Sequence, residues 1–140
     1  GGNLDMIGIY AGEELAGFFA VRKFRSIRYL AYFAVSAHRR SGGIGSRALS
    51  LLKQFYPEGQ MVIEFEAPDE STENNPIRLR RRDFYLRNGF QETGWYNFYD
   101  ETEFEIACSE LPFHREEFEE FIDFLNAIIP IHMPRPYRKV

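Results

Sequence analysis

The sequence predicts one domain of the α/β (α+β) class, built on a mixed, mostly antiparallel sheet of about six strands that is flanked by helices. Three observations predict it. Strand-like and helix-like segments alternate along 140 residues, short turns join the first three strands, and a longer connection leads to the fourth. The apolar share of 44% is ample for one core. We expect a single domain over 1–140, with a core over 6–107 and a C-terminal amphipathic helix and tail over 112–140.

The first half of the sheet follows from the lengths of the connections. Residues 6–10, 15–24 and 27–35 are strand-like, and only short turns separate them. A parallel return needs a long crossover, so these three strands must be antiparallel neighbours. Residues 38–56 supply such a crossover as a loop and a helix, and residues 61–66 form the next strand-like segment. The pattern therefore predicts that strand 61–66 runs parallel to strand 27–35.

The second half is predicted to contain a helix, two strands and a last helix. The first of these helices covers 77–87 and ends at Asn88-Gly89. Residues 90–99 and 102–107 have the composition of two strands around a turn. The last helix carries an apolar stripe made of Phe118, Phe121, Ile122, Leu125 and Ile128. The prolines that follow it predict an extended tail.

A glycine-rich turn precedes the crossover helix, and its sequence is Arg39-Arg40-Ser41-Gly42-Gly43-Ile44-Gly45-Ser46. Glycine tolerates positive φ, so successive backbone N–H groups can point the same way. The unpaired N–H groups and the dipole of a helix N-terminus favour a phosphate, and arginine adds charge and bidentate donors. The turn is therefore a predicted anion site. In the helix, apolar residues recur at helical spacing, namely Ala48, Leu49, Leu51, Leu52 and Phe55.

Charge is unevenly distributed along the chain. No acidic residue occurs between Leu15 and Pro57, where basic residues are frequent, so that half suits an anion. Over 92–123 acidic residues dominate, which fits either a solvated face or a funnel for a cationic acceptor. The net charge of −4 argues against nucleic acid as a partner.

Cysteine and histidine usage indicates neither disulfides nor a metal. Cys108 is the only cysteine, which excludes an intrachain disulfide and a cysteine cluster. The three histidines, at positions 38, 114 and 132, show no metal-ligand spacing. No apolar run approaches the ~18 residues of a membrane span, and no leader is visible. We therefore expect a cytoplasmic protein with no membrane partner.

Two motifs in the same order resemble those of one family. Arg40-x-x-Gly43-x-Gly45 resembles the R/Q-x-x-G-x-G/A signature of the GNAT superfamily of acyl-CoA-dependent N-acyltransferases. The run Asp83-Phe84-Tyr85-Leu86-Arg87-Asn88-Gly89-Phe90 is similar to the F-Y-x-x-x-G-F run that closes the GNAT fold. The order of strands and helices over 6–107 also matches. The resemblance implies a GNAT-like sheet and acetyl-CoA (coenzyme A) as cosubstrate.

A dinucleotide-binding fold is the alternative for the first motif. Gly43-x-Gly45-x-x-Ala48 also fits the fingerprint G-x-G-x-x-G/A, and Glu64 or Glu66 lies about 20 residues further on, where that fold places its ribose-binding acid. Two observations count against it. Residues 36–41 separate the first glycine from its strand, and that strand closes an antiparallel meander, whereas a dinucleotide fold opens a βαβ unit there.

The resemblance also implies where the cosubstrate binds. The strand before the loop and the strand after the crossover helix are expected to separate, with the pantetheine arm in the gap. A backbone N–H near Val35 would stabilise the oxyanion of the reaction. The loop N–H groups would hold the pyrophosphate, with help from Arg39, Arg40 or Arg47. The implied cofactor-binding residues are Phe33, Ala34, Val35, Arg39, Arg40, Ser41, Gly42, Gly43, Ile44, Gly45 and Ser46.

Three side chains are candidate acids and bases. The resemblance implies that Tyr85 protonates the departing thiolate, which a phenol of pKa about 10 can do; the alternative is a core tyrosine whose hydroxyl bonds a backbone group. An alkylamine, with a pKa of about 10.4, must lose a proton before it attacks. Glu64 and Glu66 share the strand face opposite Ile63 and Phe65, and either could take that proton directly or through a water. The alternative is a solvent-facing edge or an ion pair with an arginine.

The chain departs from the family in two respects. The sequence starts too close to the meander to include the strand and two helices that usually precede it, so we expect either a fragment of a longer protein or a chain in which the last helix or a partner subunit takes their place. Arg78 stands where many members carry an asparagine that contacts the cofactor. The arginines at 78 and 80–82 could instead meet the 3′-phosphate of coenzyme A or be solvated.

The sequence therefore predicts an N-acetyltransferase that transfers the acetyl group of acetyl-CoA to an amine-bearing small molecule or peptide by direct attack in a ternary complex. The alternative is a non-catalytic acyl-CoA-binding or interaction module. A homodimer through an exposed sheet edge or the last helix is compatible with the sequence.

Overall fold

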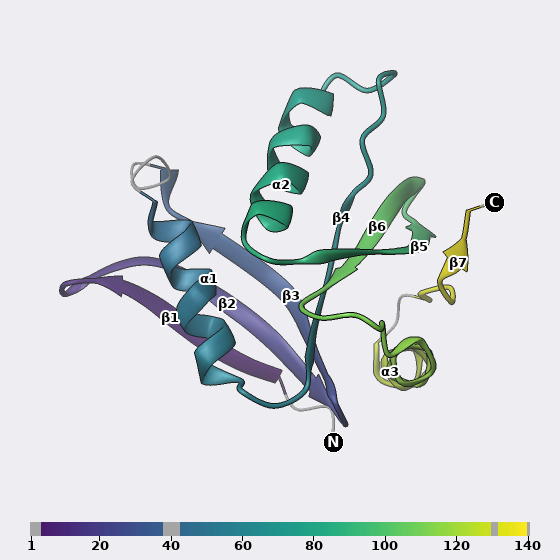
Figure 1. Ribbon diagram of the computed structural model, residues 1–140, viewed down its shortest axis with the longest axis horizontal. Helices are drawn as coiled ribbons and strands as arrows, with labels where there is room; N and C mark the ends of the chain where they lie inside the picture. Colours follow the sequence, from purple (N-terminus) through teal and green to yellow (C-terminus); the bar gives the residue numbers. More distant parts are fainter. Residues whose placement is uncertain (1–3, 38–42, 130–131, 140) are drawn as a thin grey trace.

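A seven-stranded sheet forms the centre of the part of the chain that the computed structural model describes, residues 4–37, 43–129 and 132–139 (Figure 1). The strands lie in the order β1-β2-β3-β4-β6-β5-β7. They are β1 (Leu4–Ala11), β2 (Glu14–Phe24), β3 (Ile27–Val35), β4 (Gln60–Glu66), β5 (Gln91–Tyr99), β6 (Thr102–Cys108) and β7 (Tyr137–Arg138). The helices are α1 (Ile44–Phe55), α2 (Asn75–Arg87) and α3 (Arg115–Ile128). This confirms the predicted mixed, mostly antiparallel sheet with flanking helices, with one strand more than expected.

The first three strands are antiparallel neighbours, as the short turns predict. β3 then pairs with β4 in parallel, but only over residues 27–29 and 60–62. Beyond that point β3 continues to pair with β2, and β4 with β6. The two strands therefore separate, and Figure 1 shows them diverging from the lower right of the view.

Helices cover both faces of the sheet. Side chains alternate along each strand, so apolar side chains on both faces need a covering helix. α1 and α2 lie on one face, where the core includes Phe19, Leu49, Leu52, Ile63 and Phe65. α3 lies on the other face, where the core includes Ile27, Val62, Ile106, Phe118 and Phe121. The alternation along β4 puts Ile63 and Phe65 toward α1 and α2, and Val62 and Glu64 toward α3.

The apolar stripe of α3 is used within the chain. Phe118, Phe121, Ile122 and Leu125 are at most 3% exposed, as the stripe predicts, whereas Ile128 is 52% exposed. α3 therefore occupies the sheet face opposite α1 and α2, and its stripe is not open to a partner subunit.

The buried face of α1 differs from the prediction. Ala48, Leu49 and Leu52 are buried, but Leu51 and Phe55 are 64% and 62% exposed. At 100° per residue, the three buried positions lie on one arc of the helix surface. Positions 51 and 55 lie together on the neighbouring arc, which faces solvent. Phe55 packs against Tyr56, with the ring centroids 4.9 Å apart.

The tail after α3 adds the seventh strand, where the sequence predicted only an extended segment. Residues 137 and 138 pair with Tyr96 and Trp95 of β5. The hydroxyl of Tyr137 donates to Glu103 Oε2 at 2.5 Å. Asn126 of α3 exchanges two hydrogen bonds with the backbone of Met133, at 2.6 and 2.7 Å. These contacts fasten the tail to both β5 and α3.

Candidate functional site

The gap between β3 and β4 is the first element of the candidate site. Residues 30–35 of β3 form one side and residues 63–66 of β4 the other. The predicted residues Phe33, Ala34 and Val35 are half-buried on the β3 side. A Cβ at Gly17 of β2 would lie 2.1 Å from the backbone oxygen of Ala34. Glycine at position 17 therefore allows the backbone of β2 to lie close to the end of β3.

α2 covers the gap on one face of the sheet. The ring of Phe84 lies 6.2 Å from that of Phe33 on β3. The ring of Tyr85 stacks on Phe65 of β4, with centroids 5.8 Å apart and an interplanar angle of 8°. Consecutive residues of α2 thus contact the two separating strands, one strand each.

The N-terminus of α1 opens beside the gap. Gly43 precedes the helix in the left-handed region, at φ 74°, and neither a capping side chain nor an acidic residue occupies the first turn. The N–H groups of Ile44, Gly45 and Ser46 have no acceptor within the helix. A Cβ at Gly45 would lie 3.3 Å from Phe84 Cζ, so this turn adjoins the aromatic cover of the gap. Four further predicted residues, Arg39, Arg40, Ser41 and Gly42, lie outside the described residues.

Ser36 adds an unsatisfied polar group at the same end of the gap. Its backbone N–H donates to Ala16 O at 2.7 Å, but among the described residues its buried Oγ has no hydrogen-bond partner. A buried hydroxyl without a partner costs about 1–3 kcal/mol, so this position suits a polar ligand group. The gap, the open helix N-terminus and Ser36 together fit a ligand that has an extended arm and a phosphate group, as coenzyme A has.

Tyr85 lies among aromatic rings on the α2 side of the gap. Phe65, Phe84 and Phe90 surround it, with ring centroids 5.3–5.9 Å away. Burial raises the pKa of Tyr85 to about 12, and Arg81 opposes the shift. Within the described part of the chain the hydroxyl has no hydrogen-bond partner. Tyr85 therefore keeps its proton at neutral pH and can donate it.

Glu64 lies on the opposite face of the sheet from Tyr85, on the α3 side. Its Oε1 accepts a hydrogen bond from Tyr29 Oη at 2.5 Å, and its Oε2 accepts one from Asn97 Nδ2 at 3.1 Å. Burial raises the pKa of Glu64, and the bonds from Tyr29 and Asn97 partly offset that effect. A carboxyl group with a raised pKa is a better proton acceptor than an ordinary one.

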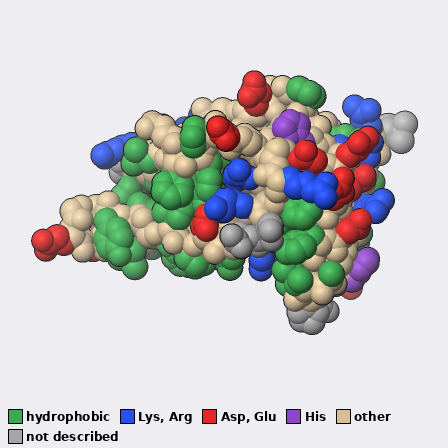
Figure 2. All heavy atoms as spheres, turned by 90° about the horizontal axis from the view of Figure 1, so that it is seen from below, with side chains coloured by type: hydrophobic (Ala, Val, Ile, Leu, Met, Phe, Trp, Pro, Cys, Tyr) green, Lys and Arg blue, Asp and Glu red, His purple; other side chains and the backbone are tan. Residues whose placement is uncertain are grey.

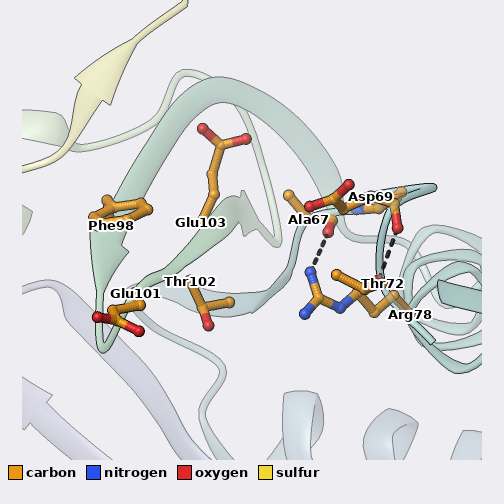
Figure 3. Close-up of a pocket in the computed structure, with 9 residues that line it drawn as sticks. Ala67, Asp69, Thr72, Arg78, Phe98, Glu101, Thr102 and Glu103 are labelled. Atoms are coloured by element: carbon orange, nitrogen blue, oxygen red, sulfur yellow. Dashed lines mark hydrogen bonds between the residues drawn. The ribbon is translucent and has the colours of Figure 1, made fainter. Parts of the chain in front are cut away.

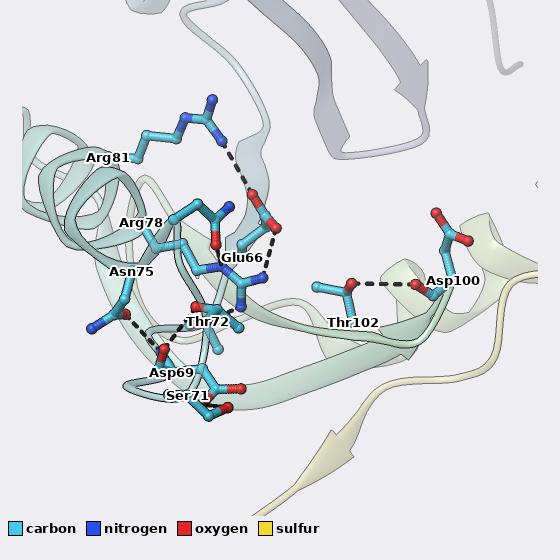
Figure 4. Close-up of polar contacts among 11 residues, drawn as sticks. Glu66, Asp69, Ser71, Thr72, Asn75, Arg78, Arg81, Asp100 and Thr102 are labelled. Atoms are coloured by element: carbon cyan, nitrogen blue, oxygen red, sulfur yellow. Dashed lines mark hydrogen bonds and ion pairs between the residues drawn. The ribbon is translucent and has the colours of Figure 1, made fainter.

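Glu66 has quite different surroundings (Figure 4). Its two carboxylate oxygens form ion pairs with Arg78 Nη2 at 3.0 Å and Arg81 Nη1 at 3.2 Å. Arg78 is only 9% exposed, and it also donates to Ala67 O and to Asn74 Oδ1. The two glutamates therefore have separate sets of partners, although they are two residues apart on β4. Arg78 belongs to this internal network.

A cavity of about 200 Å³ lies between the β4–α2 loop and the turn from β5 to β6 (Figure 3). Three carboxylates line it, those of Asp69, Glu101 and Glu103, together with the ring of Phe98. Arg78 joins this cavity to the Glu66 ion pairs. None of the candidate acids and bases lines it.

Sequence reasoning did not identify Tyr29 and Asn97 as partners of Glu64. They are 35 and 33 residues away from it, and only the pairing of the strands brings the three side chains together. The available signal was weak: a hydroxyl and an amide in strands that are otherwise apolar, where a buried polar group needs a partner. For Ser36 the sequence carried no signal.

The described residues give no indication of other chemistry. No three carboxylate, imidazole or thiol groups among them come together in a way that could hold a metal ion. Cys108 is fully buried, and burial raises its pKa, so its thiol is a poor nucleophile. None of the three described helices has the length and hydropathy to cross a bilayer.

Neither a protein-family model nor a curated protein matches the sequence, whereas solved structures match the fold. A protein from Bacteroides thetaiotaomicron assigned to the GNAT family of acetyltransferases gives a TM-score of 0.70 at 26% identity, over 91% of this chain and 73% of that chain. An aminoglycoside 6′-N-acetyltransferase complexed with coenzyme A gives 0.57 at 16% identity, over 72% and 69%. A Bacillus subtilis acetyltransferase in complex with CoA gives 0.52 at 16% identity, over 73% of each chain.

These likenesses decide between the two folds that the glycine motif allowed. The sheet joins an antiparallel meander to a single short parallel pair, and the matching structures are acetyltransferases. A dinucleotide fold would place the motif after the first strand of a mostly parallel sheet, whereas here the strand before the motif closes an antiparallel meander.

Proposed function

Because this chain belongs to the GNAT superfamily in its fold and in both of its motifs, we propose that it transfers the acetyl group of acetyl-CoA to an amine by direct attack in a ternary complex. One observation carries the proposal. The gap between β3 and β4 has Tyr85 on one face of the sheet and Glu64 on the other, and the open N-terminus of α1 lies at its end. A donor and an acceptor of protons therefore flank a site that fits coenzyme A.

The binding roles follow from the backbone. Phe33, Ala34 and Val35 offer an extended edge to the pantetheine arm, and an N–H near Val35 stabilises negative charge on the carbonyl oxygen. The first turn of α1 holds the pyrophosphate through Gly43, Ile44, Gly45 and Ser46. Residues 39–42 of the glycine-rich turn and Arg47 complete this site. Acetyl-CoA supplies an activated thioester, so that transfer forms a C–N bond, breaks a C–S bond and releases one proton.

The proton-transfer roles follow from the side chains. Glu64 takes a proton from the ammonium group of the acceptor, which leaves a nucleophilic amine. Tyr85 holds its proton for the departing sulfur and recovers it from solvent. Glu66 is the weaker candidate base, because both its oxygens already form ion pairs with arginines. The acceptor is an amine-bearing small molecule or peptide, and the acidic residues over 92–123 favour a cationic one.

Acetyl-CoA binding, measured by calorimetry, tests the first half of the proposal. The test variant is Gly43→Asp, which puts a carboxylate at the N-terminus of α1. Its matched control is Gly12→Asp in the turn between β1 and β2. Both glycines have positive φ, 74° and 66°, and a Cβ at either would meet nothing within 4 Å. We expect Gly43→Asp to weaken binding at least tenfold and Gly12→Asp to leave it unchanged.

Release of free thiol with a panel of amines tests the second half. An enzyme releases coenzyme A in proportion to the amine supplied, whereas an acyl-CoA-binding module binds acetyl-CoA and releases none. Binding without release with any amine of the panel would favour the module. Absence of binding would remove the proposed function altogether.

We also propose a homodimer that forms through the edge of the sheet at β1. Large apolar side chains of β1 and its neighbours are exposed on the sheet face that α1 leaves open: Leu4, Met6, Tyr10, Leu15 and Tyr32, at 46–64%. Figure 2 shows hydrophobic side chains gathered along the arm at the left of the molecule. Burial of this apolar surface against a second copy would supply the favourable free energy of association. The last helix offers no such surface, because its stripe is buried.

A further inference from the structure

A hydrogen bond spans the point at which β3 and β4 separate. Tyr29 is the last residue of β3 that pairs with β4, where its partner is Val62. Glu64 lies two residues further along β4, and its Oε1 accepts a hydrogen bond of 2.5 Å from the Tyr29 hydroxyl. The bond therefore fixes one carboxylate oxygen at the closed end of the gap.

A second donor holds the other oxygen. Asn97 is fully buried on β5, and its Nδ2 reaches Glu64 Oε2 at 3.1 Å. The Oδ1 of Asn97 accepts a hydrogen bond from the backbone N–H of Phe98 at 3.0 Å, which fixes the orientation of the amide. Glu64 is thus held by side chains from two different strands, and neither donor carries a charge.

The helix on this face in turn holds Tyr29. The Tyr29 ring packs against Phe121 and Phe118 of α3, with centroids 5.2 and 6.1 Å apart. Tyr99 of β5 is the other titratable group near Glu64, and the charge of Glu64 contributes to raising the pKa of both phenols. Tyr99 makes a stacked contact with Phe104 at 4.4 Å. Among the described residues, no cationic side chain neutralises Glu64.

We propose that Tyr29 and Asn97 are positioning residues that hold the Glu64 carboxylate in place to take the proton of the acceptor amine. The inference rests on the proposed function. The step is a single proton transfer from the ammonium nitrogen to a carboxylate oxygen, and it yields a neutral amine and a neutral carboxyl group. The two hydrogen bonds leave each oxygen a free lone pair, because a carboxylate accepts about four bonds.

The hydrogen bonds also influence the pH at which the Glu64 carboxyl group becomes ionised and can accept a proton. Burial raises the pKa of Glu64, and both hydrogen bonds lower it. Removing either donor therefore raises that pKa further, so that the ionised base forms only at higher pH. A residue that merely fills space would not produce this shift.

The test is the pH profile of kcat for Tyr29→Phe, with Tyr99→Phe as the control. Tyr29→Phe keeps the ring packed on α3 and removes only the hydroxyl. We expect kcat at neutral pH to fall at least tenfold, the acidic limb to move to higher pH, and KM for acetyl-CoA to stay within twofold. Tyr99→Phe removes a hydroxyl on the same sheet that makes no bond to Glu64, and we expect an unchanged profile. Asn97→Asp, which turns the second donor into an acceptor, should move the limb in the same direction as Tyr29→Phe.

Carbon-13 NMR titration of the Glu64 carboxyl group provides a readout that does not depend on turnover. We expect the titration midpoint to rise in Tyr29→Phe and in Asn97→Asp, and to stay unchanged in Tyr99→Phe. Active variants with an unmoved midpoint and an unmoved acidic limb would overturn the inference and leave the proposed function intact. A wild-type chain that binds acetyl-CoA but acetylates no amine would overturn the proposed function and, with it, any catalytic role for Tyr29 and Asn97.

Discussion

Phe84 and Tyr85 are adjacent in α2, yet their rings lie against different strands of the separating pair. Phe84 contacts Phe33 of β3, and Tyr85 stacks on Phe65 of β4. The packing of the two rings bridges the gap, whereas the hydroxyl of Tyr85 takes no part in it. Substitutions at the two positions should therefore separate the support of the gap from its chemistry.

Tyr85→Phe should lower kcat by about 10²–10⁴-fold, the usual contribution of a general acid. The ring contacts remain, so affinity for acetyl-CoA and the unfolding midpoint should stay unchanged. Because the pKa of Tyr85 is raised to about 12, the wild-type acid stays protonated at all pH values below that, and Tyr85 should cause no loss of activity between pH 7 and 10. Steady-state kinetics over this range checks both statements.

Phe84→Leu is the matched comparison and should have the reverse effect. It removes the ring contact with Phe33 beside the first turn of α1 and should weaken acetyl-CoA binding, while most of kcat remains at saturation. A Tyr85→Phe variant with wild-type kcat would show that the hydroxyl has no part in the reaction.

Gly17→Ala should destabilise the fold and weaken acetyl-CoA binding together. The new methyl group would lie 2.1 Å from Ala34 O and 2.9 Å from Val35 Cα, both backbone atoms of the β3 edge. Overpacking of this kind costs typically about 1–3 kcal/mol. Gly8→Ala on β1 is the control, because there the methyl group meets only side-chain atoms, those of Tyr10 at 2.9 Å and Leu15 at 3.5 Å, and no backbone atom. Urea unfolding and calorimetry measure the two effects, and equal behaviour of both variants would contradict the explanation.

Glu66→Gln should lower the free energy of unfolding by about 1–3 kcal/mol, because it leaves the buried guanidinium of Arg78 without its anionic partner. Partial exposure of Glu66, 25% for its side chain, keeps the loss below that of a fully buried pair. Glu120→Gln breaks an exposed pair with Arg25 and should cost less than about 1 kcal/mol. Denaturant titration of both variants measures whether loss of the Glu66–Arg78 ion pair destabilises the fold more than loss of the exposed Glu120–Arg25 pair.

Stability should depend on pH through Glu64. Its folded-state pKa is raised above the ordinary 4.5, so the folded chain favours the protonated form. The corresponding stability is fully present below pH 4.5 and is lost as pH rises through the folded-state pKa. Glu64→Gln removes this dependence, so the unfolding midpoint of the wild type should fall relative to the variant as pH rises from 4 to 8.

Asp69→Asn provides the comparison of opposite sign. Hydrogen bonds from Ser71 lower the pKa of Asp69 below 3.8, so its contribution to folding stability is present above pH 3.8 and is lost as pH falls.

For the Glu64 prediction, unfolding midpoints that move in parallel with pH for wild type and Glu64→Gln would show that Glu64 is not the group responsible.

Met6→Lys and Tyr10→Lys should convert the proposed dimer to a monomer. Both side chains are more than 60% exposed on β1, and lysine on an edge strand opposes pairing. Leu51→Lys on α1 is the control at a similar exposure of 64%. Light scattering after gel filtration measures the mass of each, and a wild-type monomer at high protein concentration would exclude the dimer.

Much of this fold could be predicted because its signals are local. Strand lengths, turn residues and the long crossover after residue 35 depend on near neighbours, so the meander and the parallel β3–β4 pair were predicted correctly. The glycine-rich turn correctly predicted that a helix follows it, although α1 begins at Ile44, inside the turn predicted over residues 39–46. The prediction failed for β7, because two residues in a proline-rich tail carry no strand pattern and depend on Trp95 and Tyr96 for pairing.

The surroundings of the carboxylates were beyond local reasoning. Alternation along β4 places Glu64 and Glu66 on one side of the strand, but their partners come from β3 and β5 for Glu64 and from α2 for Glu66. Which groups meet them depends on sheet order, and the insertion of β6 between β4 and β5 has no sequence signal. The candidate acid was easier to predict because Tyr85 lies within a short contiguous motif.

The two edges of the sheet are unequal, and this limits how copies of the chain can assemble. β7 forms one edge with two residues, next to Pro136 and Lys139, so it offers almost no backbone for pairing. β1 forms the other edge with eight residues. A contact between two β1 strands uses the longer outer edge of the sheet in both copies. Such an assembly closes at two subunits and cannot propagate into a fibre.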